Sequence, residues 1–240
     1  MRCLTGVLEN PPLHRRVAWP RRWDHWVVAA GMTALVALAA SKANAQTLAT
    51  LAAFNGDNGQ GPQAGLTLIG NTLYGTTVGG GDRGDGTAFS VPVTGGAPTV
   101  LASFQLSYGG SSGPAAGVTL SGNTLYGTTV SGGAYGDGTV FSVPLSGGSP
   151  TVLVSFSENT NGQNPFGGLT LIGNTLFGTT SQGGASGYGT VFSVPATGGT
   201  PTVLASFSGD NGVGPYGDLT LFGNTLYGTG QRSRCPRKPT

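Results

Sequence analysis

Charged side chains are scarce in this sequence, and most of the basic ones lie at its two ends. Only 8% of the 240 residues are Asp, Glu, Lys or Arg, and residues 46–229 contain one basic side chain, Arg83, against seven acidic ones. A nucleic-acid-binding surface needs clustered Lys and Arg side chains to neutralise phosphates. We therefore expect no nucleic-acid partner for this part of the chain.

Histidine and cysteine are almost absent as well. His14, His25 and Cys3 lie near the N-terminus, and the second cysteine is Cys235. Residues 46–229 therefore offer no imidazole to activate the many Ser and Thr hydroxyls, and no cysteine cluster to hold a metal. We predict no catalytic residues, no enzymatic activity and no bound cofactor.

One long apolar run, residues 26–40, follows a basic segment and precedes the small residues Ala43-Asn44-Ala45. Signal peptides have this order of segments, and the run is shorter than a bilayer span requires. We predict a signal peptide over residues 1–45, cleaved before Gln46. The product would be exported to the extracellular space, the periplasm or the cell surface, with no stable membrane span. An uncleaved membrane anchor is the alternative.

After residue 45 no segment has the apolar period of an amphipathic helix. Instead, glycine and proline, 45 and 15 residues of the chain, recur at fixed offsets within a repeat of about 51 residues. The motif Asn-Thr-Leu-aromatic-Gly-Thr begins at Asn71, Asn123, Asn174 and Asn224. The motif Gly-Thr-x-Phe-Ser-Val-Pro begins at Gly86, Gly138 and Gly189. A repeat of this length is typical of solenoids, propellers and similar arrays.

Each repeat contains four short runs rich in Val, Leu, Thr and aromatic residues, bounded by Gly, Pro, Asn and Asp. In the second copy they are residues 117–120, 124–129, 139–143 and 151–156. Such runs predict strands joined by tight turns. Four antiparallel strands in about 50 residues make one blade of a β-propeller, so the predicted fold class is all-β and propeller-like. A β-solenoid or an open array is the alternative.

The phase of the repeat predicts three complete blades and an incomplete fourth. The complete blades cover residues 65–104, 117–156 and 167–207, and the first two strands of the fourth lie within 217–229. The leading strand, residues 48–54, has the sequence of a fourth strand. We expect it to join the last blade and close the ring, which gives a propeller domain over residues 46–229.

The repeat resembles that of the choice-of-anchor tandem repeat GloVer family. The resemblance is carried by Leu-Tyr-Gly-Thr-Thr at 125–129 and the Gly-Gly…Gly-Thr-Val-Phe segment at 132–141. The first recurs at 176–180 with Phe177 in place of Tyr, the second recurs at 183–192, and the resemblance covers about residues 48–229. It implies an exported or surface-associated bacterial protein without an established activity. Residues 230–240 depart from the pattern, with four basic residues in eleven, and we interpret this basic tail as a frameshift or a truncation.

Aromatic residues in loops are the candidate ligand contacts, because exposed rings on a nearly uncharged surface stack on sugars or fill a partner's pocket. The aromatic residues of the second strand in each repeat are instead expected to pack in the core. The candidate loop residues are Tyr108, Tyr135, Phe166, Tyr188 and Tyr216.

Two glycine-rich loops, residues 80–86 and 132–138, have some likeness to Ca²⁺-binding repeats. The spacing differs, and the third copy has no acidic residue there. We expect loops in which Asp bonds to nearby backbone, with no metal ligands; Ca²⁺ is the alternative.

These features favour an exported, non-enzymatic binding or scaffolding module at the cell surface, with an extracellular glycan or protein as partner. The alternatives are a purely structural surface or matrix protein, and a truncated fragment of a longer propeller without independent function. An incomplete blade leaves an unpaired strand edge, so we also predict a homodimer formed through the open blade edge.

Overall fold

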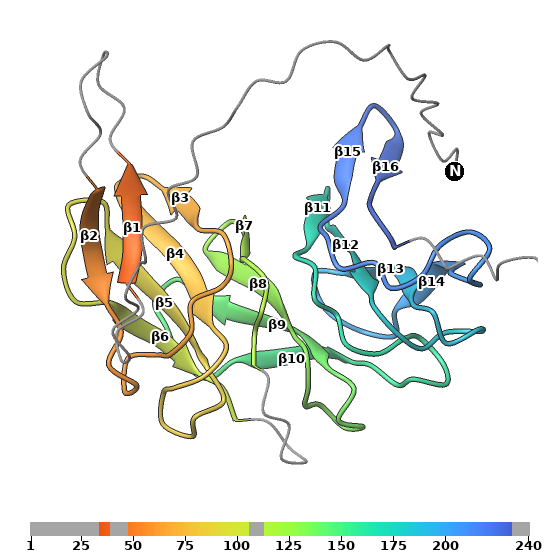
Figure 1. Ribbon diagram of the computed structural model, residues 1–240, viewed down its shortest axis with the longest axis horizontal. Coiled ribbons are helices and arrows are strands. Elements are labelled where there is room, and N and C mark those ends of the chain that lie inside the picture. The colour runs from red at the N-terminus through yellow and green to blue at the C-terminus, as the bar shows by residue number, and fades with distance from the viewer. Residues whose placement is uncertain (1–33, 39–47, 106–112, 232–240) are drawn as a thin grey trace, which may run out of the picture. The chain divides into compact units, whose positions relative to one another are not determined.

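The computed structural model describes residues 34–38, 48–105 and 113–231, and for residues 34–38 it describes the backbone (Figure 1). The chain divides into two units, Met1–Gly31 and Met32–Thr240, and all described residues belong to the second. Within this part of the chain, no helix has the length and apolarity needed to cross a membrane.

Three four-stranded antiparallel sheets follow one another along the chain, and we call them blades 1, 2 and 3, with strands a, b, c and d in chain order. Blade 1 contains β3 (Thr67–Ile69), β4 (Thr72–Thr77), β5 (Thr87–Pro92) and β6 (Thr99–Ser103). Blade 2 contains β7 (Thr119–Ser121), β8 (Thr124–Thr129), β9 (Thr139–Pro144) and β10 (Thr151–Ser155). Blade 3 contains β11 (Thr170–Ile172), β12 (Thr175–Thr180), β13 (Thr190–Pro195) and β14 (Thr202–Ser206). The three predicted complete blades are confirmed.

Local sequence explains where the strands begin and end. Strand c of blade 2 ends at Pro144, which has no N–H to donate to a ladder. The chain then turns through Gly147 and Gly148, whose φ angles are 81° and 134°. Residues with a side chain rarely adopt these backbone angles, so the two adjacent glycines determine the turn between strands c and d.

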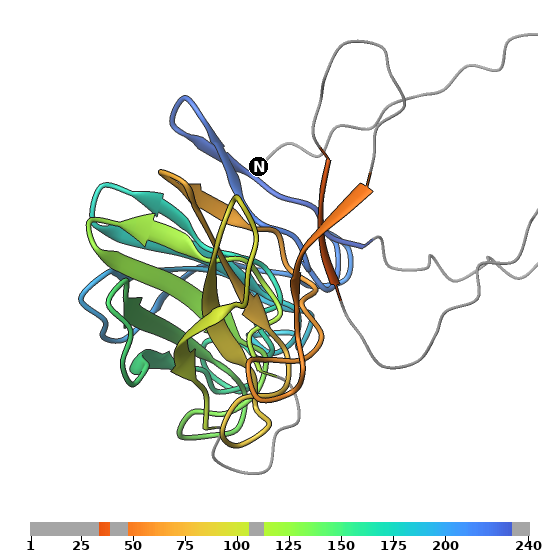
Figure 2. The same cartoon turned by 90° about the vertical axis from the view of Figure 1, so that its left-hand side faces the viewer.

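Two further sheets have two strands each. Strands β15 (Thr220–Phe222) and β16 (Thr225–Tyr227) repeat the pairing of strands a and b, and we call them blade 4. The other sheet pairs β2 (Leu48–Ala53) with β1 (Ala34–Leu38), and Figure 2 shows this pair beside blade 1.

The expectation that residues 48–54 would join the last blade is wrong, because β2 pairs with β1 and not with blade 4. In every complete blade strand d bonds to strand c. Among the described residues, blade 4 has strands a and b alone. A strand d therefore finds no strand c there to bond with.

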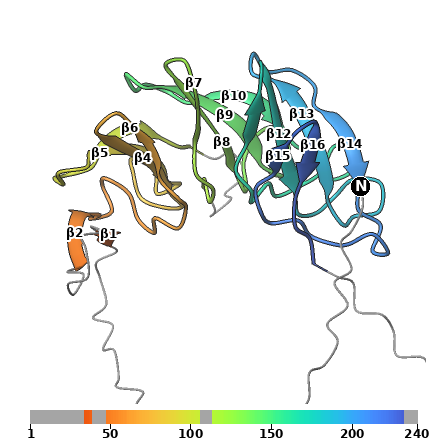
Figure 3. The same ribbon diagram turned by 90° about the horizontal axis from the view of Figure 1, so that it is seen from above.

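The core lies between blades 1, 2 and 3, because residues of neighbouring sheets share its apolar clusters. Figure 3 shows these sheets following one another. Phe104 of blade 1 meets Phe141 of blade 2 edge to face, with ring centroids 4.7 Å apart. Phe156 and Phe192 repeat this contact between blades 2 and 3 at 4.9 Å. The same ring contact thus joins successive repeats, and it buries the largest side chains of the core.

Threonine hydroxyls reinforce each junction between blades. Thr76 Oγ1 donates to the carbonyl of Ala116 in the next repeat at 2.8 Å, and Thr128 Oγ1 donates to that of Gly167 at 3.1 Å. Among the described residues, no buried side-chain nitrogen or oxygen lacks a hydrogen-bond partner. The polar groups that the repeat buries are therefore paired, as buried polar groups must be to avoid a large desolvation cost.

Candidate functional site

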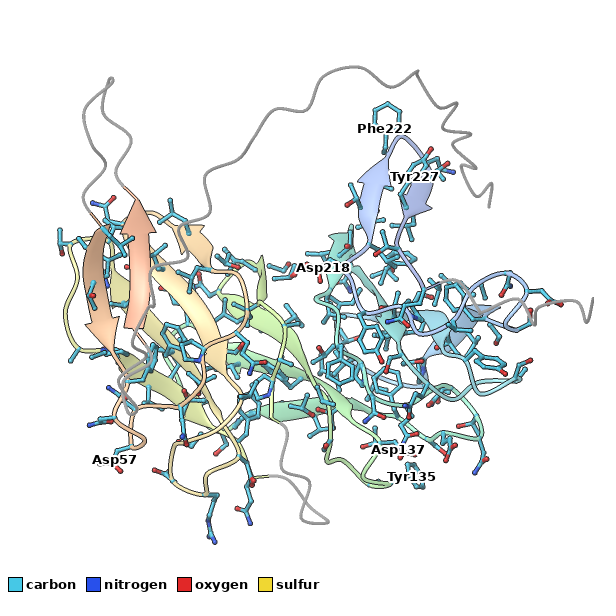
Figure 4. The ribbon with its side chains drawn as sticks, in the orientation of Figure 1. Asp57, Tyr135, Asp137, Asp218, Phe222 and Tyr227 are labelled. Atoms are coloured by element: carbon cyan, nitrogen blue, oxygen red, sulfur yellow. The ribbon has the colours of Figure 1, made fainter. Side chains whose placement is uncertain are left out.

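The loops that join strands b and c lie at the same end of the blades as the loops that join strand d to the next blade. This follows because strands b and d run in the same direction in each antiparallel sheet. The two kinds of loop are bonded together. Asn164 N donates to Asp137 O at 2.8 Å, and Gly214 N donates to Tyr188 O at 2.9 Å. Figure 4 shows Tyr135 and Asp137 at this loop end of blade 2.

A hollow of about 450 Å³ lies between blades 2 and 3, beside strand β10. Tyr135 stands on one side of it, and the turn at Gly199–Pro201 of blade 3 forms another. Its polar side chains are those of Tyr135, Ser155, Thr160, Asn161 and Thr200. Its lining contains hydroxyl and amide groups and an aromatic ring, but no charged side chain.

A second hollow, of about 530 Å³, occupies the equivalent place beside β2. It is lined by residues 50–53, by Asn55 and Asn58, and by the turn residues Gly96 and Ala97 of blade 1. Asn58 corresponds to Asn161 in the repeat. The hollow is therefore a feature of the repeat, whereas the aromatic ring on its rim belongs to the second copy alone.

Among the predicted loop aromatics that the structure describes, Tyr135 is the most exposed, at 66%. The corresponding positions in the other copies hold Arg83 and Ser186. No fold constraint common to the repeats thus requires an aromatic ring at this position. Its place on the rim of the hollow makes it the strongest ligand-contact candidate of the described loops.

Tyr188 plays a different part. It occupies the repeat position of Asp137, and its backbone carbonyl accepts the bond from Gly214 N. A Cβ placed on Gly209 would lie 3.6 Å from Cε2 of Tyr188, so the ring lies over that glycine. Tyr188 therefore packs one loop on the next, although its side chain remains 46% exposed.

Phe166 and Tyr216 contact each other, with ring centroids 5.2 Å apart and planes tilted by 48°. They come from successive loops that precede strand a, so this pair also fastens neighbouring repeats. The fifth candidate, Tyr108, lies outside the described residues.

The carboxylate of Asp137 is used within the protein. Its Oδ2 accepts the backbone N–H of Glu158 at 2.8 Å, and its Oδ1 accepts Nε2 of Gln163 at 2.7 Å. No group of three or more His, Cys, Asp or Glu side chains that would suit a metal occurs among the residues the structure describes. These hydrogen bonds favour the interpretation that Asp137 holds two loops together over the interpretation that it is a Ca²⁺ ligand.

Blade 4 differs from its neighbours in how it exposes aromatic residues. Tyr227 occupies the position of Tyr74 and Tyr126, which pack against the core, yet half of its side chain is exposed. Phe222 beside it is 77% exposed, and Figure 4 shows both on the β15–β16 hairpin. The expectation that Tyr227 packs in the core is wrong, because no described blade follows blade 4.

Residues 32–236 match the family model of the Gloeobacter/Verrucomicrobia repeat. The chain belongs to this repeat family. The match is longer than the resemblance seen in the motifs, since it begins ahead of β1. A comparison with curated proteins finds no match.

The fold of this repeat protein is similar to that of a chain in the crystal structure of the nidogen/laminin complex, with a TM-score of 0.53 and 17% sequence identity. The similarity covers 79% of the repeat protein and 63% of that chain. At this identity the likeness concerns the fold alone, and together with the sheet topology it supports the β-propeller architecture over a solenoid.

Proposed function

We propose that this repeat protein is an exported, non-catalytic binding module, and that the hollow beside Tyr135 takes a neutral glycan. The observation that carries the proposal is the lining of the hollow. An exposed aromatic ring stands beside hydroxyl and amide groups, with no charged side chain among them. Rings stack on the apolar faces of sugars, while hydroxyl and amide groups bond to sugar hydroxyls.

The volume of the hollow, about 450 Å³, falls within the range of small-molecule sites. Its walls come from two blades that are held together by the Phe156–Phe192 contact. Such a rigid support lowers the ordering cost of binding. Loop residues on a rigid scaffold are a common arrangement of binding sites.

A glycan array followed by calorimetry tests the proposal. We expect the purified protein to bind a neutral oligosaccharide, and Tyr135→Ala to weaken that binding by about tenfold or more, as the loss of an aromatic anchor does. Tyr188→Ala is the matched control, because it removes a half-exposed loop tyrosine outside the hollow. We expect the control to bind as the parent protein does.

The competing function is that of a structural surface or matrix protein without a discrete ligand. It predicts no binding across neutral and charged glycans and across extracellular protein partners. An equal loss of binding in Tyr135→Ala and Tyr188→Ala would also contradict the proposed site, because both changes would then act through loop structure.

A further inference from the structure

The pairing of β1 with β2 reproduces the pairing of strands c and d in the blades. In blade 1, Thr87 pairs with Ser103 and Ala88 with Ala102, and after a bulge Phe89 pairs with Val100. In the β1–β2 sheet, the corresponding pairs are Ala34 with Ala53 and Leu35 with Ala52, and after a bulge Val36 with Thr50. The extra residue of the bulge is at the corresponding position in both sheets, Leu101 in blade 1 and Leu51 in β2.

Strand β2 also packs on blade 1 as strand d of each blade packs on the next. Phe54 meets Phe89 edge to face with centroids 4.8 Å apart, close to the 4.7 Å of Phe104 and Phe141. The turn N–H of Gly96 donates to Leu51 O at 2.9 Å. The equivalent bonds, from Gly148 to Leu101 and from Gly199 to Leu153, measure 2.8 and 3.2 Å.

Strand β2 therefore packs on blade 1 as a strand d does. The edge of β2 that bonds to β1 has the register in which strand d bonds to strand c. In the intact chain residues 34–38 occupy that edge. The family match begins at residue 32, which places these residues within the repeat as well. The same residues lie inside the predicted signal peptide, so the predicted cleavage before Gln46 would vacate the edge.

We propose that the edge of β2 is a strand-addition site that takes an extended polypeptide of the strand-c pattern, Thr-Val-Phe-Ser-Val, from another repeat-bearing chain. Residues 34–38 hold the site until the leader is removed. Strand addition supplies main-chain hydrogen bonds for affinity, and the side chains that point toward blade 1 supply selectivity. The bulge and the register set by β2 favour strand c over an arbitrary apolar peptide.

Once residues 34–38 are removed, the edge of β2 needs an occupant for a physical reason. An unpaired strand edge presents a row of free N–H and C=O groups that pair with any compatible strand. In the three complete blades that partner is always strand c. The proposal rests on the proposed export only where it calls for removal of the leader; it is independent of the hollow at Tyr135.

A peptide of residues 138–146, which contains strand β9, is the probe. Its binding to the intact chain and to the Leu35→Pro variant is followed by fluorescence anisotropy. Leu35 holds the position of Ala88, which faces strand d, since Gly86 two residues earlier on the same side accepts the N–H of Phe104. Proline at this position removes the equivalent N–H from the β1–β2 ladder. We expect the variant to bind the peptide with 1:1 stoichiometry, about tenfold or more tightly than the intact parent. In the variant with bound peptide, amides 48–53 should exchange more slowly than in the variant alone.

A peptide with Val140→Pro is the matched control, and we expect it not to bind. Equal binding of both peptides, or of the parent and variant chains, would overturn the proposal. If the variant self-associates by pairing two β2 edges in place of binding the peptide, the edge takes a strand d and not a strand c, and the proposal is wrong.

The processed chain beginning at Gln46 provides a second measurement if Leu35→Pro does not fold. It should bind the probe without any substitution, and failure to bind would overturn the proposal. Tyr135→Ala in the processed chain should leave peptide binding unchanged. Failure of the glycan experiment and failure of strand addition can therefore be told apart.

Discussion

At the scale of single residues, the junction between blades depends on a glycine opposite a phenylalanine. Gly127 of strand b pairs across the sheet with Phe141 of strand c, and the pairs Gly75–Phe89 and Gly178–Phe192 repeat this arrangement. A Cβ on Gly127 would lie 2.5 Å from Cζ of Phe141. The absence of a side chain thus lets the ring lie across the neighbouring strand and reach the preceding blade.

We predict that Gly127→Ala destabilises the protein by about 1–3 kcal/mol, the usual cost of overpacking a core. An alanine also restricts the unfolded chain, but that gain of about 0.5–1 kcal/mol is smaller. The free energy of unfolding in urea measures the difference. The matched control is Gly65→Ala, since a Cβ at Gly65 meets nothing within 4 Å.

The steric origin of this effect has its own test. Phe141→Leu shortens the side chain that the new methyl group meets, so the double variant should lose less stability than the two single losses add up to. Additive losses would show that the methyl group acts elsewhere.

At the scale of elements, strands c and d share one bulged register in all three complete blades, and the β1–β2 sheet shares it too. The bulge places two residues of strand d opposite one residue of strand c. Since a one-residue slip in a sheet exchanges its two faces, this shared register is a stringent criterion for β1 as a strand c.

We predict that cysteines at Ala37 and Ala49 of the intact chain form a disulfide on mild oxidation, because these residues are paired. The background carries Cys3→Ser and Cys235→Ser. The control pair, Ala37→Cys with Thr50→Cys, is one residue out of register and should cross-link far more slowly. Mass spectrometry of the non-reduced digest measures both yields. Similar yields would mean that β1 does not hold one register.

At the scale of the whole molecule, stability is shared between nearest-neighbour blades, as in other repeat proteins. The junctions of blade 2 are complete on both faces. At blade 4 the described residues supply strands a and b alone. Leu204 of blade 3 is accordingly half exposed, whereas Leu101 and Leu153 pack against the core.

We predict that the native state opens first at blade 4. Amide hydrogen exchange should be fastest in β16 and slowest in β8 and β12, whose leucines are fully buried. Leu125→Ala should cost about 2–5 kcal/mol of unfolding free energy, and Leu226→Ala, at the same repeat position, less than half as much. Equal exchange rates in β8 and β16 would indicate that the blades unfold as one unit.

The strands and their grouping into blades follow from the sequence alone. Turn residues such as Pro144, Gly147 and Gly148 act locally, and the same residue types recur at these positions in each complete repeat. The ends of the strands can therefore be predicted from three independent copies. Core packing of Tyr74 and Tyr126 in strand b was likewise predictable, whereas the environment of Tyr227 depends on a following blade.

Tertiary structure alone decided which distant segments meet. The hollow combines a loop of one repeat with a turn of the next, and no pattern within a single repeat identifies Tyr135 as the aromatic on its rim. Residues 34–38 have the composition of a signal-peptide core and of a buried strand alike, because both are short apolar runs. Their pairing with β2, in the register and with the bulge of a strand c, depends on the tertiary structure.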